Sequence, residues 1–135
     1  MFSKILIANR GIIRLNCIRA IQELGARAAV LYTSEEAQGV GVRMADEAYP
    51  LTASKPGEEY YNEDGIVQIA RTIGADAVHP GYGFLAQNPR FAKKLADARI
   101  HLIASVDDDK VVTKEAALKL HLPVVPGSDP CIGLP

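Results

Sequence analysis

Apolar runs typical of buried strands alternate along this chain with segments of helical periodicity. Residues 4–9, KILIAN, are mostly apolar without alternation, as expected for a strand buried on both faces. Residues 11–24 then place apolar side chains at helical spacing before Gly25, which would end a helix there. A second apolar run follows at 26–33. Strand followed by helix, repeated in this way, predicts a parallel sheet covered by helices on both faces.

The alternation continues to about residue 121. The inward stripe of the first helix is expected to comprise Ile13, Cys17, Ala20, Ile21 and Leu24. A glycine-containing connection at 35–44 follows the second strand, and further strands are expected at 46–51, 76–80 and 100–104. Further helices are expected from Asn62 to Gly74, after Asn88–Pro89, and over 108–121. The fold class is therefore a Rossmann-like, doubly wound parallel sheet of about five strands.

Composition and charge argue against some classes of function. The formal net charge of −1 indicates no field that would attract nucleic acid or an anionic membrane. No apolar run is long enough to span a bilayer, and the N-terminus lacks the layout of a signal or transit peptide. The two cysteines share no motif spacing. A cytoplasmic location is expected, with an organellar matrix as the alternative.

The loops that follow the strands carry the candidate chemistry, because parallel sheets bind ligands beyond the carboxyl ends of their strands. In HPGYGF (79–84), Gly81 and Gly83 would let backbone N–H groups approach an anion, with Tyr82 and Phe84 as an apolar wall. Alternatively, the glycines only supply positive φ and the aromatic rings only pack. His79 is expected to be a hydrogen-bonded structural residue, since no second metal ligand accompanies it.

The first strand-to-helix loop does not carry a dinucleotide fingerprint. That fingerprint needs three glycines, and only Gly11 is present, followed by Ile12 and Ile13 where small residues would be needed. Arg10 in the same loop is expected to form a structural ion pair with a neighbouring carboxylate.

Six stretches, in order, resemble the N-terminal domain of biotin carboxylase, a ligase of the ATP-grasp superfamily. They are KILIANRG (4–11), IRAIQELG (18–25), ADEAYPL (45–51), YYNEDGIVQIA (60–70), GADAVHPGYGFLAQN (74–88) and LPVVPGS (122–128). The resemblance implies a pre-ATP-grasp domain over 1–121 and, over 122–135, a Pro- and Gly-rich tail that starts the linker to a missing ATP-grasp domain. The implied reaction activates bicarbonate with ATP and carboxylates biotin on a carrier protein.

The resemblance also implies roles for individual residues. The loop of Gly81, Tyr82, Gly83 and Phe84 would face biotin and bicarbonate, with Gln87 near it. Lys110 aligns with a lysine that contacts ATP phosphate; alternatively it is a solvated lysine after an acidic helix start. Arg19 and Glu23 would lie in a homodimer interface; alternatively they form an exposed i,i+4 pair. The magnesium-binding and catalytic residues would follow Pro135, so no catalytic residue is assigned to this chain.

The chain departs from the family pattern at the expected ligand-facing rim. NRGIIR stands for NRGEIA, which removes a carboxylate at Ile12 and adds a bulky cation at Arg14. AQN stands for SEN at 86–88, which replaces a carboxylate by the Gln87 amide, and IAS stands for IGP at 103–105. Two hypotheses follow. The chain is one wall of a biotin carboxylase active site, silent without the ATP-grasp remainder, or it is a non-catalytic relative or truncated form that binds or regulates carboxylase subunits.

Overall fold

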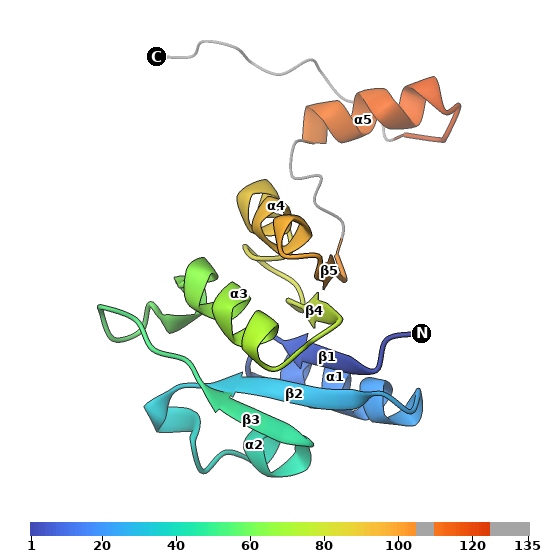
Figure 1. Ribbon diagram of the computed structural model, residues 1–135. Helices are drawn as coiled ribbons and strands as arrows, with labels where there is room; N and C mark the ends of the chain where they lie inside the picture. The colour runs from blue at the N-terminus through green and yellow to red at the C-terminus, as the bar shows by residue number, and fades with distance from the viewer. Residues whose placement is uncertain (105–109, 125–135) are drawn as a thin grey trace.

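The computed structural model describes residues 1–104 and 110–124, and within them a parallel sheet is flanked by helices (Figure 1). The strand order is β3-β2-β1-β4-β5, and every neighbouring pair is parallel. The strands are β1 (Lys4–Ile7), β2 (Arg27–Tyr32), β3 (Glu47–Pro50), β4 (Ala77–His79) and β5 (His101–Leu102). The predicted α/β class and parallel sheet are confirmed.

Helices join the strands at the predicted places. They are α1 (Gly11–Glu23), α2 (Val40–Met44), α3 (Glu63–Thr72), α4 (Pro89–Asp97) and α5 (Lys110–Lys119). Two 3-10 turns, η1 (Ser34–Glu36) and η2 (Glu59–Tyr61), precede α2 and α3. The glycine-containing connection at 35–44 holds part of η1 and all of α2.

Capping side chains explain where α3 and α4 begin. The Asn62 side-chain oxygen accepts a hydrogen bond from the Gly65 N–H at 3.0 Å. The Asn88 side-chain oxygen accepts from the N–H groups of Arg90 and Phe91 at 3.0 and 3.1 Å. Each cap satisfies N–H groups that the first helical turn leaves without a partner. Both predicted N-caps are confirmed.

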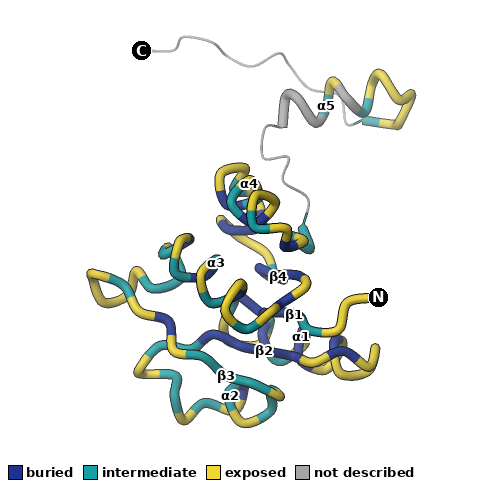
Figure 2. The backbone as a smooth tube through the Cα atoms, viewed as in Figure 1, coloured by how far each residue is buried: buried dark blue, intermediate teal, exposed yellow. Residues whose placement is uncertain are grey.

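The central strands β1, β2 and β4 are largely buried, whereas the edge strands β3 and β5 are partly exposed (Figure 2). Leu6 of β1 packs in a cluster with Ile66 of α3 and Phe91 of α4. Its neighbours Ile5 and Ile7 join a second cluster with residues of α1. Successive side chains of β1 therefore point to opposite cores, because side chains alternate across a strand.

The buried face of α1 differs from the predicted stripe. Arg14, Cys17, Ile18 and Ile21 are buried, whereas Ala20 and Leu24 are exposed. Ala20 and Leu24 instead line an open apolar groove together with Phe2 and Leu102. The buried face of the helix thus includes Arg14, a residue that was expected at the ligand-facing rim.

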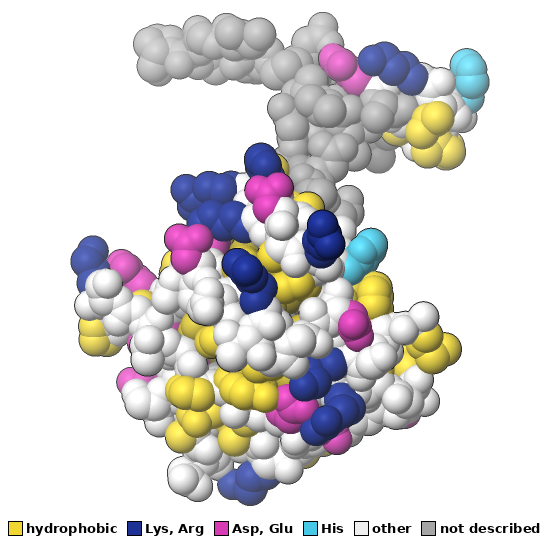
Figure 3. Space-filling view, viewed as in Figure 1, with side chains coloured by type: hydrophobic (Ala, Val, Ile, Leu, Met, Phe, Trp, Pro, Cys, Tyr) yellow, Lys and Arg dark blue, Asp and Glu magenta, His cyan; other side chains and the backbone are white. Residues whose placement is uncertain are grey.

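Surface charge, membrane-spanning helices and the C-terminal tail are the other features that the sequence analysis addressed. Basic and acidic side chains are interspersed over the described surface in view in Figure 3, in keeping with the net charge of −1. Among the helices that the structure describes, none is long and apolar enough to cross a membrane. Residues 125–135, most of the predicted tail, lie outside the described residues.

Candidate functional site

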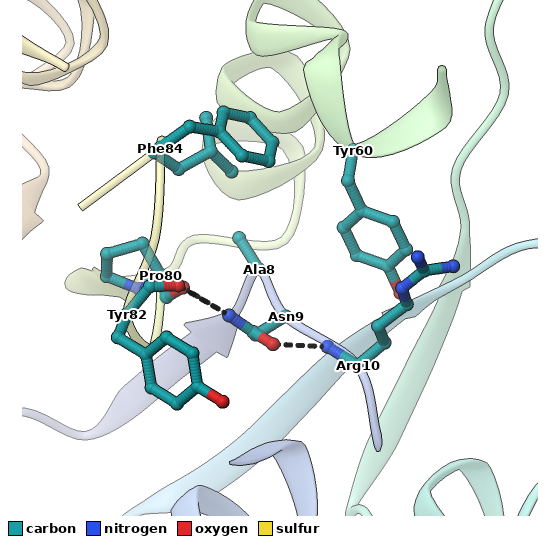
Figure 4. Close-up of a pocket in the computed structure, with 8 residues that line it drawn as sticks. Ala8, Asn9, Arg10, Tyr60, Pro80, Tyr82 and Phe84 are labelled. Atoms are coloured by element: carbon teal, nitrogen blue, oxygen red, sulfur yellow. Dashed lines mark hydrogen bonds between the residues drawn. The ribbon is translucent and has the colours of Figure 1, made fainter. Parts of the chain in front are cut away.

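A pocket of about 160 Å³ lies at the carboxyl ends of β1 and β4 (Figure 4). Because β1 and β4 are adjacent and parallel, the loops that follow them meet at the same edge of the sheet. Figure 4 shows the loop after β4 on one side, with Tyr60 and Arg10 facing it across Ala8 and Asn9. The pocket is lined by Ala8, Asn9, Arg10, Tyr60, Pro80, Tyr82, Phe84 and Leu85.

Asn9 ties the two loops together. Its side-chain NH2 group donates to the carbonyl oxygens of Pro80 at 2.6 Å and Tyr82 at 3.3 Å, and its oxygen accepts from the Arg10 N–H at 2.8 Å. Sequence reasoning missed this role, although Asn9 stands directly after a buried strand. A short side chain with both a donor and an acceptor at that place is the signal that could have identified it.

Gly81 makes this contact possible. Its φ is +69°, and a Cβ atom there would lie 2.7 Å from Ile13 Cγ2 and closer still to Asn9 Nδ2. Gly83 also has a positive φ, of +105°, but a Cβ atom there would meet no other atom within 4 Å. The turn conformation proposed for both glycines is therefore confirmed, and only Gly81 is also required for space.

The aromatic residues of the loop behave differently from one another. Tyr82 leaves 73% of its surface exposed, although it lines the pocket. Phe84 stacks on Tyr61 with ring centroids 4.2 Å apart and planes 17° from parallel. Packing therefore accounts for the part of the Phe84 ring that stacks on Tyr61. It does not account for Tyr82, whose side chain is mostly exposed. Gln87 is exposed and lies outside the pocket lining.

His79 supports the loop from the end of β4. Its Nδ1 atom accepts a hydrogen bond from the Gly81 N–H at 3.0 Å, which confirms the predicted structural role. Burial lowers the pKa of the imidazole, so the neutral form that can accept at Nδ1 is favoured. Cys17 Sγ lies 3.7 Å from the same nitrogen, and burial raises the pKa of this thiol, which therefore stays protonated and unreactive.

We expect His79 to make stability depend on pH. Because the folded-state pKa is below the ordinary value of about 6.5, the unfolded state takes up the proton first and the stability contribution falls as the pH drops below that value. Unfolding free energies measured from pH 7.5 to 5 should fall more steeply for this chain than for a His79→Asn variant, which cannot titrate. Equal slopes would contradict the assignment.

Two arginines near the start of α1 differ in their surroundings. Among residues 1–104 and 110–124, no carboxylate pairs with Arg10, so the expected ion pair is not found there; the side chain borders the pocket. Arg14, expected at the ligand-facing rim, is 5% exposed and points into the fold. Its Nη2 atom lies 3.3 Å from a carboxylate oxygen of Glu36, which compensates the buried charge.

The two residues predicted for a homodimer interface lie apart from the pocket lining. Arg19 and Glu23 are both exposed on α1, and the structure shows no ion pair between them within the described residues. Lys110 begins α5, and its side chain lies outside the described part of the structure. In the part of the chain that the structure describes, no group of three or more His, Cys, Asp or Glu side chains could hold a metal ion.

The chain is similar in sequence to known proteins of one family. The sequence model of a family described as biotin carboxylase, N-terminal domain, matches residues 1–108. A pyruvate carboxylase subunit of Methanothermobacter thermautotrophicus is 42% identical over 96% of this chain and 28% of its own length. The 2-oxoglutarate carboxylase small subunit of Hydrogenobacter thermophilus shows the same identity and coverage.

Solved structures show the same similarity in three dimensions. The biotin carboxylase domain of a thermophilic 2-oxoglutarate carboxylase, solved with bicarbonate bound, superposes with a TM-score of 0.82 at 40% identity. The match covers 96% of this chain and 30% of that one. The chain thus spans less than a third of the length of the relatives that it matches.

Proposed function

The chain belongs to the biotin carboxylase N-terminal domain family, and on that premise we propose that it forms one wall of a biotin carboxylase active site and is not catalytic alone. The observation that carries the proposal is the pocket between the loops after β1 and β4. Its wall contains Tyr82 and Phe84 on a backbone held by Asn9 and Gly81. Such a wall offers aromatic surface to a ring and backbone polar groups to a small anion.

The roles of the loop residues follow from this placement. The loop of Gly81, Tyr82, Gly83 and Phe84 faces biotin and bicarbonate, because Tyr82 and Phe84 present exposed aromatic surface at the edge where parallel sheets bind ligands. Gln87, exposed in the same loop, lies near the substrate region in this proposal.

Other segments bind ATP, magnesium and the protein partners. Lys110 at the start of α5 contacts ATP phosphate, and an ATP-grasp remainder supplies the magnesium ligands and the catalytic groups. A biotin carboxyl carrier protein delivers the substrate. Arg19 and Glu23, exposed on α1, contribute to a homodimer interface.

The experiment uses two proteins. The first is the 135-residue chain, and the second, called the hybrid carboxylase below, joins residues 1–104 to the matching remainder of the Methanothermobacter pyruvate carboxylase protein. We expect no biotin-dependent ATP hydrolysis by the chain and measurable hydrolysis by the hybrid, because the catalytic groups come from the remainder. Turnover by the purified chain alone, or a folded hybrid without turnover, would overturn the proposal.

A second candidate function is a silent partner of intact carboxylase subunits. It is favoured by Ile12, which is 65% exposed at the start of α1 where the family pattern has a carboxylate. Ile12 is not part of the pocket lining, and at this position it offers apolar surface where the family pattern offers a charge. A folded but inactive hybrid that associates with intact subunits would favour this function.

A further inference from the structure

Arg14 is an arginine buried inside the fold. It is 5% exposed, and its Nη1 atom donates to the Leu31 carbonyl at 2.9 Å. Its Nε atom is buried without a hydrogen-bond partner in the described residues. The side chain fits only because residue 41 is glycine, since a Cβ atom there would lie 2.6 Å from Nε. A buried cation with incomplete hydrogen bonding is costly, so its retention calls for an explanation beyond packing.

Glu36 links Arg14 to a tyrosine. One carboxylate oxygen faces Arg14 Nη2 at 3.3 Å. The other accepts from the Thr33 N–H at 3.1 Å and from the Tyr60 hydroxyl at 2.9 Å. The Tyr60 hydroxyl also lies 3.2 Å from the Leu31 carbonyl, the same oxygen that Arg14 contacts. Arg14, Glu36 and Tyr60 therefore form one network at the end of β2.

Tyr60 carries this network to the candidate site. Its ring is the pocket wall opposite Tyr82 and Phe84, as Figure 4 shows. Tyr60 belongs to the short turn η2, so helical hydrogen bonding fixes it less firmly than it would a residue of α3. The hydroxyl contacts at the far end of the ring then fix the position of its face.

We propose that Arg14 and Glu36 are positioning residues of the pocket: by holding the Tyr60 hydroxyl, they set the distance between the Tyr60 ring and the loop of Tyr82 and Phe84. Neither residue lines the pocket, so both act through Tyr60. The identity of the ligand as biotin rests on the proposed function, whereas the positioning of Tyr60 does not. Arg14, the cation that departs from the family pattern, therefore has a structural role in positioning Tyr60.

The state of the Tyr60 hydroxyl is consistent with this role. Burial, with the Glu36 charge and hydrogen bond adding to it, raises the pKa of Tyr60 well above its usual range. The hydroxyl therefore remains a donor at neutral pH. A donor that always finds the Glu36 carboxylate holds the ring in one place.

A fluorine NMR experiment on the 135-residue chain tests the positioning directly. The chain has five tyrosines, so 3-fluorotyrosine gives few signals, and Tyr60→Phe and Tyr82→Phe identify the two that matter. Arg14→Met and Glu36→Gln should each move the Tyr60 signal toward that of exposed Tyr82. Each should also make it more sensitive to replacing H2O by D2O. If Arg14→Met does not fold, Glu36→Gln decides, because it keeps the side-chain volume.

The chain offers a matched control at the other end of the sheet. Lys4 and Glu47 form an ion pair of 3.0 Å with side chains 19% and 15% exposed, and Glu47 accepts from the Tyr49 hydroxyl. Lys4→Met and Glu47→Gln should move the Tyr49 signal and leave Tyr60 unchanged. A Tyr60 signal that does not move in Arg14→Met or Glu36→Gln, or that moves equally in the controls, would overturn the proposal.

The hybrid carboxylase supplies the functional measurement. Arg14→Met and Glu36→Gln should raise the KM for biotin by about tenfold with kcat nearly unchanged, which marks lost binding and not lost chemistry. A loss of stability alone would lower the amount of active enzyme and leave KM as it was. If the unmodified hybrid is inactive, the proposed function fails while the fluorine signals still decide the positioning.

Discussion

Replacing Gly81 by alanine should lower the free energy of unfolding by about 2–5 kcal/mol, because it combines backbone strain with a clash. An alanine at φ +69° costs about 1–2 kcal/mol on its own. Its Cβ atom would also press on Ile13 Cγ2 and Asn9 Nδ2, and overpacking of this kind costs about 1–3 kcal/mol more. In the hybrid carboxylase, the displaced Asn9 would release the Pro80 carbonyl, so biotin-dependent hydrolysis should fall as well.

The matched control for this variant is Gly74→Ala. Gly74 follows α3 with a φ of +64°, nearly that of Gly81, but a Cβ atom there would meet nothing within 4 Å. It should therefore show only the backbone strain, about 1–2 kcal/mol in urea unfolding, and leave the hybrid active. Equal losses of stability in the two variants would show that the contact with Asn9 is unimportant.

Replacing Phe91 by alanine should lower the free energy of unfolding by about 3–5 kcal/mol without altering the pocket directly. Phe91 of α4 is fully buried in the cluster that joins α3, α4 and the sheet. Its removal leaves a cavity in addition to the lost burial of the ring. Chemical denaturation of the 135-residue chain measures the effect.

Phe84→Ala is the control, because the same substitution acts on an exposed ring. Phe84 leaves 45% of its surface exposed and contacts Tyr61 by stacking. We expect a smaller loss than for Phe91, because the aromatic pair contributes about 0.5–1.5 kcal/mol and the side chain is only partly buried. In the hybrid, the order should reverse: Phe84→Ala should impair biotin-dependent hydrolysis, and Phe91→Ala should leave the KM for biotin unchanged. A Phe84 variant with normal kinetics would remove this ring from the proposed wall.

The fold could be predicted from the sequence because the patterns that indicate it are local. The N-caps Asn62 and Asn88 act on N–H groups two or three residues away, and the unbroken apolar strands need no partner to be recognised. Proximity of the loops after β1 and β4 follows from parallel pairing alone. The candidate pocket could therefore be placed at the correct edge of the sheet.

The buried contacts behind the pocket could not be predicted from the sequence in the same way. Arg14 stands four and seven residues before Ile18 and Ile21, which is the spacing of an inward-facing position, but it was expected at the ligand-facing rim. Burial depends on Glu36 as a partner and on Gly41 for space, both more than twenty residues away. The surroundings of Arg10 at the pocket could not be predicted for the same reason, because tertiary packing decides which side chains lie near it.

The KM for biotin in the hybrid carboxylase, before and after Tyr82→Ala, tests the central claim most directly. Tyr82 is 73% exposed, so the substitution should leave the melting temperature of the hybrid unchanged. If the loop after β4 is the biotin-facing wall, the hybrid is active and Tyr82→Ala raises KM about tenfold, which corresponds to about 1.4 kcal/mol of lost binding. A folded hybrid whose KM for biotin is the same with and without Tyr82 would contradict the account.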